Sequence, residues 1–154
     1  MALPVVAQSF EPDFLAGCAA YDRKDYATVL KHWRPLAKQG HADAQLYLGV
    51  MYRLGYAVTK DYKQAVRWFR KAANQGSHGA QWSLGEMYEE GHGVVQDLVM
   101  AYVWLNVAIA NGGSRELDRN VAQAKLNVLE LRLGRKLSKR CFKKPAKCPE
   151  YSDD

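Results

Sequence analysis

The strongest constraint on this chain is an internal repeat. Residues 41–76 and 77–112 align without a gap as two copies of one unit. A period of this length is typical of a stacked-repeat solenoid, in which each unit buries its apolar face against its neighbours. The identical positions are Ala44/Ala80, Gln45/Gln81, Leu48/Leu84, Gly49/Gly85, Met51/Met87, Tyr52/Tyr88, Gly55/Gly91, Val58/Val94, Asp61/Asp97, Ala65/Ala101, Trp68/Trp104, Ala72/Ala108 and Gly76/Gly112.

Each copy has two apolar stripes with helical spacing. In the first copy Ala44, Leu48 and Tyr52 lie four residues apart, so they share one face of a helix, and a second stripe follows after a break. The break begins with Gly55 and ends with Asp61, which is the order of a helix stop and an N-cap. Each unit is therefore predicted to be helix, loop, helix.

Two signature residues predict close packing between these helices. Gly49 and Gly85 lie inside the first helix, where glycine costs about 1 kcal/mol relative to alanine. Because this cost recurs in register, we expect the second helix to cross there too closely for a Cβ atom. Trp68 and Trp104 are expected to be mostly buried between successive helices.

The two copies follow one spaced pattern, A-x-x-x-L-G-x-x-Y-x-x-G-x-x-V-x-x-D-x-x-x-A-x-x-W-x-x-x-A-x-x-x-G. This pattern resembles the SEL-one-like repeat, a relative of the tetratricopeptide repeat, and covers roughly half of the chain. Ala57 departs from it, since the family usually has a second loop glycine there, and a slightly different loop shape is expected. The resemblance implies an all-α, right-handed α-solenoid of antiparallel helix pairs that acts as a non-catalytic protein–protein interaction scaffold.

The flanking segments are interpreted as caps. Residues 11–40 carry a degenerate earlier unit, because Asp25 and Gly40 precede Asp61 and Gly76 by the repeat length and Ala16-Gly17 is the expected close-contact pair. End repeats of solenoids are commonly atypical. Residues 113–154 resemble the C-terminal extension of bacterial members of the family, with two closing helices and a short cysteine-containing segment.

The predicted organisation has five segments and about eight helices, with no strand. The segments are an N-terminal tail at 1–10, a capping repeat at 11–40, repeats at 41–76 and 77–112, and capping helices with a basic tail at 113–154. The helices are expected at roughly 13–22, 25–38, 42–54, 61–74, 78–90, 97–111, 115–126 and 128–142. Residues 1–10 read either as the remnant of a signal peptide, with small residues before Gln8, or as an ordinary frayed N-terminus.

Positive charge gathers near the C-terminal end. The chain has 22 basic and 16 acidic residues, for a formal net charge of +6, and residues 132–147 contain no acidic residue. The alternative function is therefore an electrostatic binder of nucleic acid or anionic membrane through this tail. The simpler interpretation is a solvated helix face and a soluble terminus. Nucleic acid is disfavoured because, apart from Phe142, no aromatic residue is interleaved with the cations.

The three cysteines bear on the compartment. Cys141 and Cys148 flank Pro145 at a spacing that a turn after a helix could close into a disulfide, and Cys18 is left over on an apolar stripe. A disulfide would place the chain in an oxidising space, the periplasm or the exterior of a bacterial cell, whereas two free thiols would favour the cytoplasm. No transmembrane segment is expected, because no apolar run is long enough.

No residue pattern predicts catalysis or a bound cofactor. The chain lacks a C-x-x-C motif, and no histidine lies near the tail cysteines, so a metal site is not expected. Cys18 has no catalytic signature around it, and the chain is predicted not to be an enzyme.

The expected binding surface lies on the first helix of each repeat. Because the buried signature positions fix one side, the opposite side follows from the helical pitch, and resemblance to tetratricopeptide stacks makes it the concave groove. Its candidate residues are Leu46, Val50, Arg53 and Leu54 in one copy and Trp82, Glu86, Glu89 and Glu90 in the next.

This composition predicts an apolar floor and an acidic rim. Trp82 near an arginine is typical of a binding hot spot, and the glutamates would favour a basic protein or peptide segment, or the basic tail of a second copy of the chain. The alternative is that Leu46 and Trp82 merely pack against each other between neighbouring helices.

Overall fold

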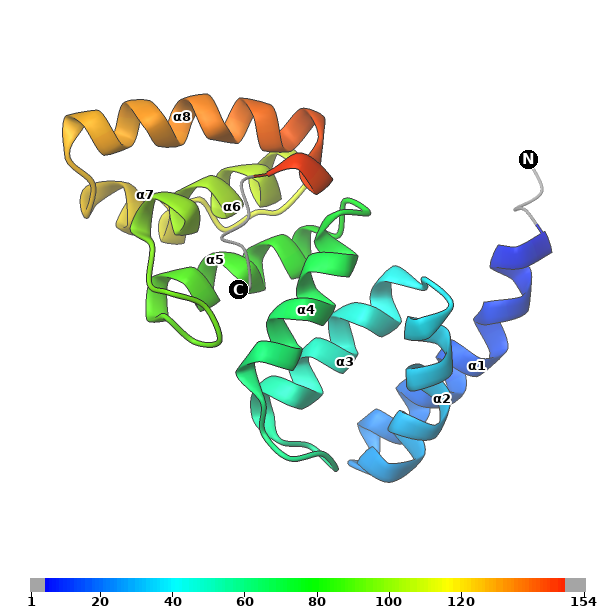
Figure 1. Ribbon diagram of the computed structural model, residues 1–154. Helices are drawn as coiled ribbons and strands as arrows, with labels where there is room; N and C mark the ends of the chain where they lie inside the picture. Colours follow the sequence, from blue (N-terminus) through cyan, green and yellow to red (C-terminus); the bar gives the residue numbers. More distant parts are fainter. Residues whose placement is uncertain (1–4, 149–154) are drawn as a thin grey trace.

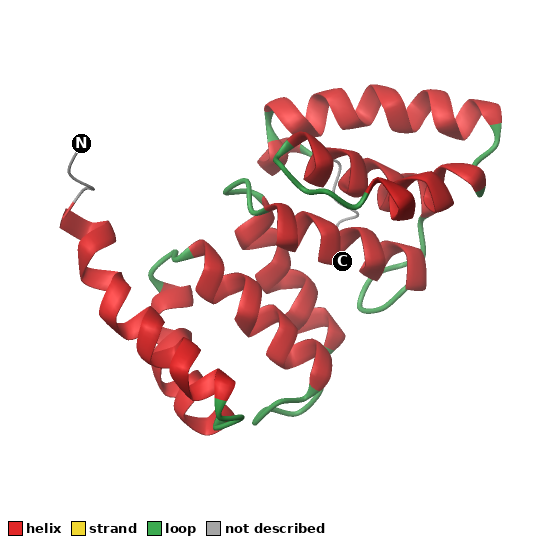
Figure 2. Ribbon diagram, turned by 180° about the vertical axis from the view of Figure 1, so that it is seen from behind, coloured by secondary structure: helices red, strands yellow, loops and turns green. Residues whose placement is uncertain are grey.

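The chain is a stack of helix pairs. The structure, a computed structural model, describes residues 5–148, and at 5–11, 117 and 147 it describes the backbone only. Successive pairs follow one another from α1 and α2 to α7 and α8, and the described part of the chain contains no strand (Figures 1 and 2). The elements are α1 (Val5–Asp22), α2 (Tyr26–Lys38), α3 (Ala42–Leu54), α4 (Tyr62–Ala73), α5 (His78–Glu90), α6 (Leu98–Ala110), α7 (Glu116–Ala124), α8 (Val128–Lys143) and the short 3₁₀ helix η1 (Pro145–Lys147). The predicted solenoid architecture is confirmed.

The first helix is longer than expected. α1 begins at Val5 and runs through Pro12, where the prediction placed its start after the proline. Proline removes one helical hydrogen bond, but the helix continues across it here, so this proline is not a helix boundary. Residues 1–4 of the predicted N-terminal tail lie outside the described residues.

Aspartates cap the second helix of both repeats, as predicted. The Asp61 carboxylate accepts a hydrogen bond from the Gln64 backbone N–H at 3.0 Å, and Asp97 accepts one from Met100 at 2.9 Å. The backbone N–H of Asp61 donates a hydrogen bond to the Tyr52 carbonyl at 2.9 Å. Side-chain capping thus satisfies an orphan N–H of each helix start, and the loop is tied back to the first helix.

The Ala57 loop keeps the shape of its counterpart, contrary to the expectation of a different shape. Ala57 has a φ of 53°, close to the 73° of the equivalent Gly93. An alanine in the left-handed region costs roughly 1–2 kcal/mol because its Cβ crowds the following carbonyl oxygen. The first repeat therefore holds a strained residue where the second has a glycine.

Replacing Ala57 with Gly is expected to stabilise the chain by about 0.5–1 kcal/mol, because the relief of strain exceeds the added unfolded-state entropy. Chemical denaturation measures this change in the free energy of unfolding. The matched control is Gly93→Ala, which should destabilise, since a Cβ at Gly93 would lie 2.4 Å from the Tyr62 carbonyl oxygen. A lower stability of the Ala57→Gly variant would contradict the inference that Ala57 is strained.

The helices of the first three pairs cross at a glycine, as predicted for the repeats. A Cβ at Gly49 would lie 2.6 Å from the Phe69 ring, and one at Gly85 would lie 2.8 Å from Leu105. The degenerate first pair repeats the device, since a Cβ at Gly17 would lie 2.1 Å from the Trp33 ring nitrogen. All three contacts are closer than real Cβ contacts, which explains why glycine is needed there.

A buried glutamine links three successive helices in each repeat. The Gln45 side-chain amide donates to the Ala37 carbonyl at 2.9 Å, and its oxygen accepts from the Gln75 side chain at 2.8 Å. In the next unit Gln81 donates to the Ala73 carbonyl and accepts from Asn111, both at 3.0 Å. We call this arrangement the glutamine bridge. It ties the C-terminal ends of two second helices to the first helix between them.

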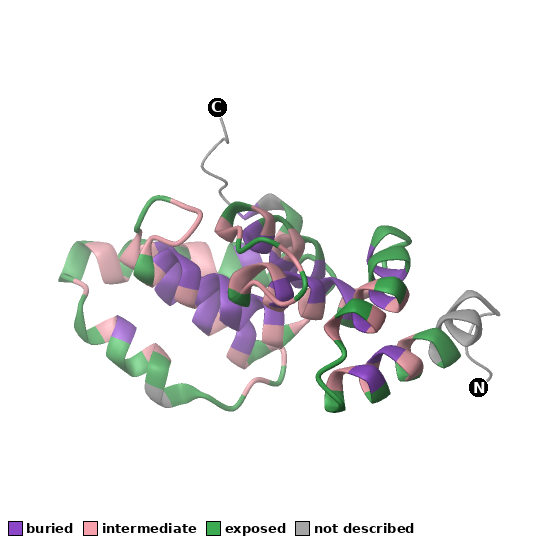
Figure 3. Cartoon of the chain, turned by 90° about the horizontal axis from the view of Figure 1, so that it is seen from below, coloured by how far each residue is buried: buried purple, intermediate pink, exposed green. Residues whose placement is uncertain are grey.

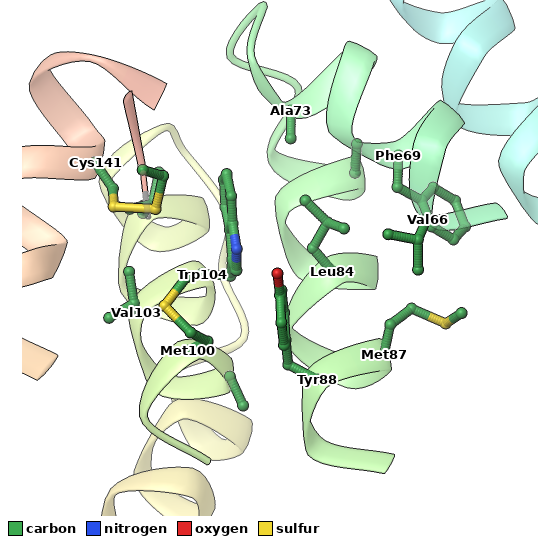
Figure 4. Close-up of a cluster of buried hydrophobic side chains, with 14 of the residues drawn as sticks. Val66, Phe69, Ala73, Leu84, Met87, Tyr88, Met100, Val103, Trp104 and Cys141 are labelled. Carbon is green, nitrogen blue, oxygen red and sulfur yellow. A yellow bond between two sulfur atoms is a disulfide. The ribbon is translucent and has the colours of Figure 1, made fainter. Parts of the chain in front are cut away.

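Buried side chains concentrate around α5 and α6 (Figure 3). α6 carries no charged residue and packs against α5, α7 and α8, so it is covered on several sides. Trp104 on this helix is 3% exposed and lies in the core beside Tyr88 and the cysteine pair (Figure 4). Trp68 is only half-buried, with the Lys71 ammonium 4.6 Å above its ring. The expected burial therefore holds fully for Trp104 alone, because the C-terminal segment covers it.

The described part of the chain closes with a turn after α8. Cys141, in the last part of α8, forms a disulfide with Cys148, and their Cα atoms are 4.7 Å apart. Both cysteines are buried in the same core cluster as Trp104. Cys18 lies half-buried in α1, against the aromatic cluster of the first helix pairs.

Candidate functional site

Three of the predicted groove residues meet on one side of α5. The Glu86 carboxylate accepts a hydrogen bond from the Trp82 indole N–H at 3.0 Å and pairs with the Arg53 guanidinium at 2.6 Å. The Arg115 guanidinium lies over the Trp82 ring, 4.6 Å from its centroid, which is the geometry of a cation–π contact. The indole is thus held at its edge by a carboxylate and on its face by a cation.

Trp82 and Glu86 separate two hollows, which together we call the α5 groove. The first, of about 300 Å³, is lined by both residues together with Arg53, His78, Gly79, Ser83, Ala108, Gly112, Gly113, Ser114 and Arg115. The second, of about 480 Å³, is lined by both residues together with Glu89, Glu90, Leu105, Asp118, Val121 and Lys125. The two hollows differ in charge: the first holds two arginines, and the second holds most of the acidic side chains.

The predicted apolar floor is divided between two parts of the core. Leu46 and Val50 are half-buried and pack against the cluster of α4, α5 and α6, and a Cβ at Gly79 would lie 3.1 Å from Leu46. Trp82 is 8% exposed and packs instead against α6 and α7. Leu54, 44% exposed, lies at the end of α3. The exposed apolar surface of the groove is therefore Val121 with the edge of Trp82, because Leu105 is only 1% exposed.

The predicted acidic rim is partly neutralised. Glu89 pairs with Lys125, and Glu90 pairs with the His92 imidazole at 2.8 Å. Asp118 adds a carboxylate to the same hollow. The rim keeps an excess of negative charge, but each glutamate already has a cationic or hydrogen-bonding partner.

Sequence reasoning missed the contribution of the C-terminal helices. Arg115, Asp118 and Lys125 come from the segment after the second repeat, which carries no signature residue. The Gly112-Gly113 turn that precedes them was the available signal, because it reverses the chain and brings α7 back toward α5. No described helix is long and apolar enough to cross a membrane, and the described residues include no group of three or more His, Cys, Asp or Glu side chains suited to a metal ion.

The comparisons with known proteins agree with this architecture. The Sel1 repeat family model matches residues 42–77 and 78–113. The chain is a Sel1 repeat protein. Both Sel1 repeats contribute to the α5 groove, the first through Arg53 and the second through most of the lining. No curated protein sequence matches the chain.

Two solved structures resemble the chain. One is c5321, a protective antigen present in uropathogenic Escherichia coli strains that displays an SLR fold, with 31% identity, a TM-score of 0.84, and coverage of 88% of this chain and 30% of that one. The other is a Sel1 repeat protein from Oxalobacter formigenes, with 32% identity, a TM-score of 0.65, and coverage of 68% and 44%. The chain thus spans less than half the length of either.

These relationships indicate the class of function. Sel1 repeat proteins are generally protein-interaction scaffolds and are typically non-catalytic. The disulfide between Cys141 and Cys148 indicates an oxidising environment.

Proposed function

We propose that the chain is a non-catalytic scaffold that binds an extended segment of a partner protein in the α5 groove. The observation that carries this proposal is the position of Trp82, an aromatic residue fixed by Glu86 and Arg115 between two adjoining hollows. Aromatic anchors beside arginine are enriched at binding hot spots. Because the ring is already held in place, little conformational entropy is lost when a partner contacts it.

The charges of the groove support a partner segment with a basic residue. The hollow of Glu89, Glu90 and Asp118 has one cation, Lys125, among its lining residues. An apolar side chain of the partner would contact Val121 and the edge of Trp82, and a neighbouring lysine or arginine would reach the carboxylates. Complementary charge of this kind raises the association rate and selects among partners.

We also propose that the protein works in the periplasm or outside the cell. The disulfide supports this location, since such bonds persist in oxidising compartments and are rare in the cytosol. The partner is then expected among envelope or extracellular proteins.

The test of the groove compares the amount of partner protein captured by the parent chain with that captured by variants that keep the fold. Trp82→Ala would also remove core packing, so the sharper variant is Glu86→Lys with Glu90→Lys, two partly exposed positions on α5. It should weaken capture about tenfold or more, because truncation or reversal at an interface charge pair costs several kcal/mol. Proteins captured from a detergent-solubilised envelope extract, in which no bilayer is present for α8 to bind, are quantified by mass spectrometry.

The comparison variant is Lys143→Glu with Lys144→Glu, two exposed positions after the second repeat. It changes two charges by the same magnitude outside the groove and should capture the same partner as the parent chain. Loss of capture with this tail pair, together with full capture by the groove pair, would show that the groove is not the binding surface.

A further inference from the structure

The last long helix has one face that no described residue of the chain covers. α8 lies along the outer edge of the stack (Figure 1). Its inner side is fixed by the buried residues Gly134 and Cys141, and a Cβ at Gly134 would lie 2.8 Å from the Tyr102 ring of α6. At about 100° per residue, the opposite side is set by the helical pitch. We call it the outer face of α8. Its residues are Val128, Leu129, Arg132, Lys136, Lys139, Arg140 and Lys143, all of them exposed.

Large apolar side chains stand exposed at one end of this helix. Val128 is 75% exposed and Leu129 is 74% exposed, and Leu133, on the flank of the outer face, is 49% exposed. On the other flank Phe142 is 47% exposed and borders an apolar hollow with Tyr102 and Ala110. Exposed apolar side chains gathered on one element indicate a site that interacts with another protein or with a membrane.

Cations make up the rest of the outer face. α8 also carries Arg135, and Lys144 follows its end. Its one acidic residue, Glu130, accepts a hydrogen bond from the Asn127 backbone N–H at 2.8 Å and completes the capping box, so it is used at the helix start. Clustered lysines and arginines are attracted to an anionic membrane surface, and exposed apolar side chains favour the interface between head groups and acyl chains.

We propose that the outer face of α8 docks on an anionic lipid bilayer, with its cations at the lipid head groups and the Val128, Leu129 and Leu133 side chains in the interface. Nucleic acid would pair with the cations but leave these apolar side chains in water. A bilayer accommodates both kinds of side chain. Basic residues near its surface are attracted to anionic head groups, and apolar side chains enter the boundary between head groups and acyl chains. A straight helix at the edge of the molecule suits a planar surface.

This docking is separate from the α5 groove. The groove is lined by residues of α3, α5, α6, α7 and the turn between α6 and α7. A chain held on a bilayer through α8 therefore keeps those side chains available to a partner, and the two proposals can fail independently.

The test is co-flotation of the full chain with vesicles of phosphatidylcholine containing phosphatidylglycerol, and with vesicles of phosphatidylcholine alone. Binding is expected only to the anionic vesicles. Lys136→Glu with Arg140→Glu should weaken it about tenfold or more, because each basic residue near the surface contributes to attraction by the head groups. Leu129→Ser with Leu133→Ser should weaken it about fivefold, since less apolar area enters the interface.

The matched control is Lys31→Glu with Lys38→Glu, which makes the same charge change at exposed positions on α2. It should bind as the parent chain does, and circular dichroism should show all variants folded. Three results would overturn the proposal: equal loss of binding in the control, no effect of the two leucine substitutions, or no binding to anionic vesicles. Dimerisation that these leucine substitutions abolish would also overturn it, because a second copy would then cover the face.

Discussion

Replacement of Trp104 by Ala should lower the free energy of unfolding by about 3–5 kcal/mol, the range for removing a fully buried aromatic side chain. The residue packs in the core between α5 and α6, with the cysteine pair beside it (Figure 4). Because α6 packs against α5, α7 and α8, truncation of the indole leaves a cavity inside the core. Urea denaturation followed by circular dichroism measures the change.

Two companion variants make this prediction specific. Trp68→Ala should cost only about 1–2 kcal/mol, because Trp68 is half-buried and lies under Lys71. Trp104→Phe should cost less than Trp104→Ala, since the Trp104 indole N–H is buried without a hydrogen-bond partner in the described part of the chain, and phenylalanine removes that unpaired donor. Equal losses for Trp68→Ala and Trp104→Ala would contradict the assigned packing.

Reduction of the disulfide should destabilise the chain by about 2–3 kcal/mol, the loop-entropy estimate for a closed loop of this size. The bond joins residues seven apart in sequence and closes the segment that covers Trp104. Thermal melting with and without a reducing agent measures the loss. Cys141→Ala with Cys148→Ala should melt as the reduced parent does and should not respond to the reducing agent.

Cys18→Ala is the control, because it removes a half-buried cysteine outside the pair. It should melt close to the parent chain and keep the response to the reducing agent. Mass spectrometry of the unreduced, alkylated protein gives an independent check: alkylation should leave Cys141 and Cys148 unmodified. Modified thiols at these two positions would favour the cytoplasm instead of an oxidising compartment.

The fold was predictable because each element depends on local residues that recur. Asp61 and Asp97 set helix starts through their own carboxylates. Gly49 and Gly85 mark the helix crossings, since only a residue without a Cβ fits there. Such features are encoded within one repeat and appear twice, so their physical role could be inferred without a structure.

The site was less predictable because it depends on contacts between distant segments. Arg53 and Glu86 were expected on one surface, but their ion pair and the stacking of Arg115 on Trp82 arise from the way α3, α5 and the α6–α7 turn meet. The half-burial of Trp68 is likewise decided by what covers it. Signature residues show which side of a helix is buried, but they do not determine how far each side chain is buried.

The glutamine bridge has a consequence for the way the stack unfolds. Gln45 hydrogen-bonds to the end of α2 and to Gln75 in the turn after α4, so its amide is satisfied only when all three helices are in place. Opening of one helix pair would leave a buried amide unpaired in the next, which costs about 1–3 kcal/mol. In a one-dimensional array this acts as nearest-neighbour coupling. The helices from α2 to α6 should therefore open together in hydrogen exchange, as one cooperative unit, where uncoupled repeats would fray from one end.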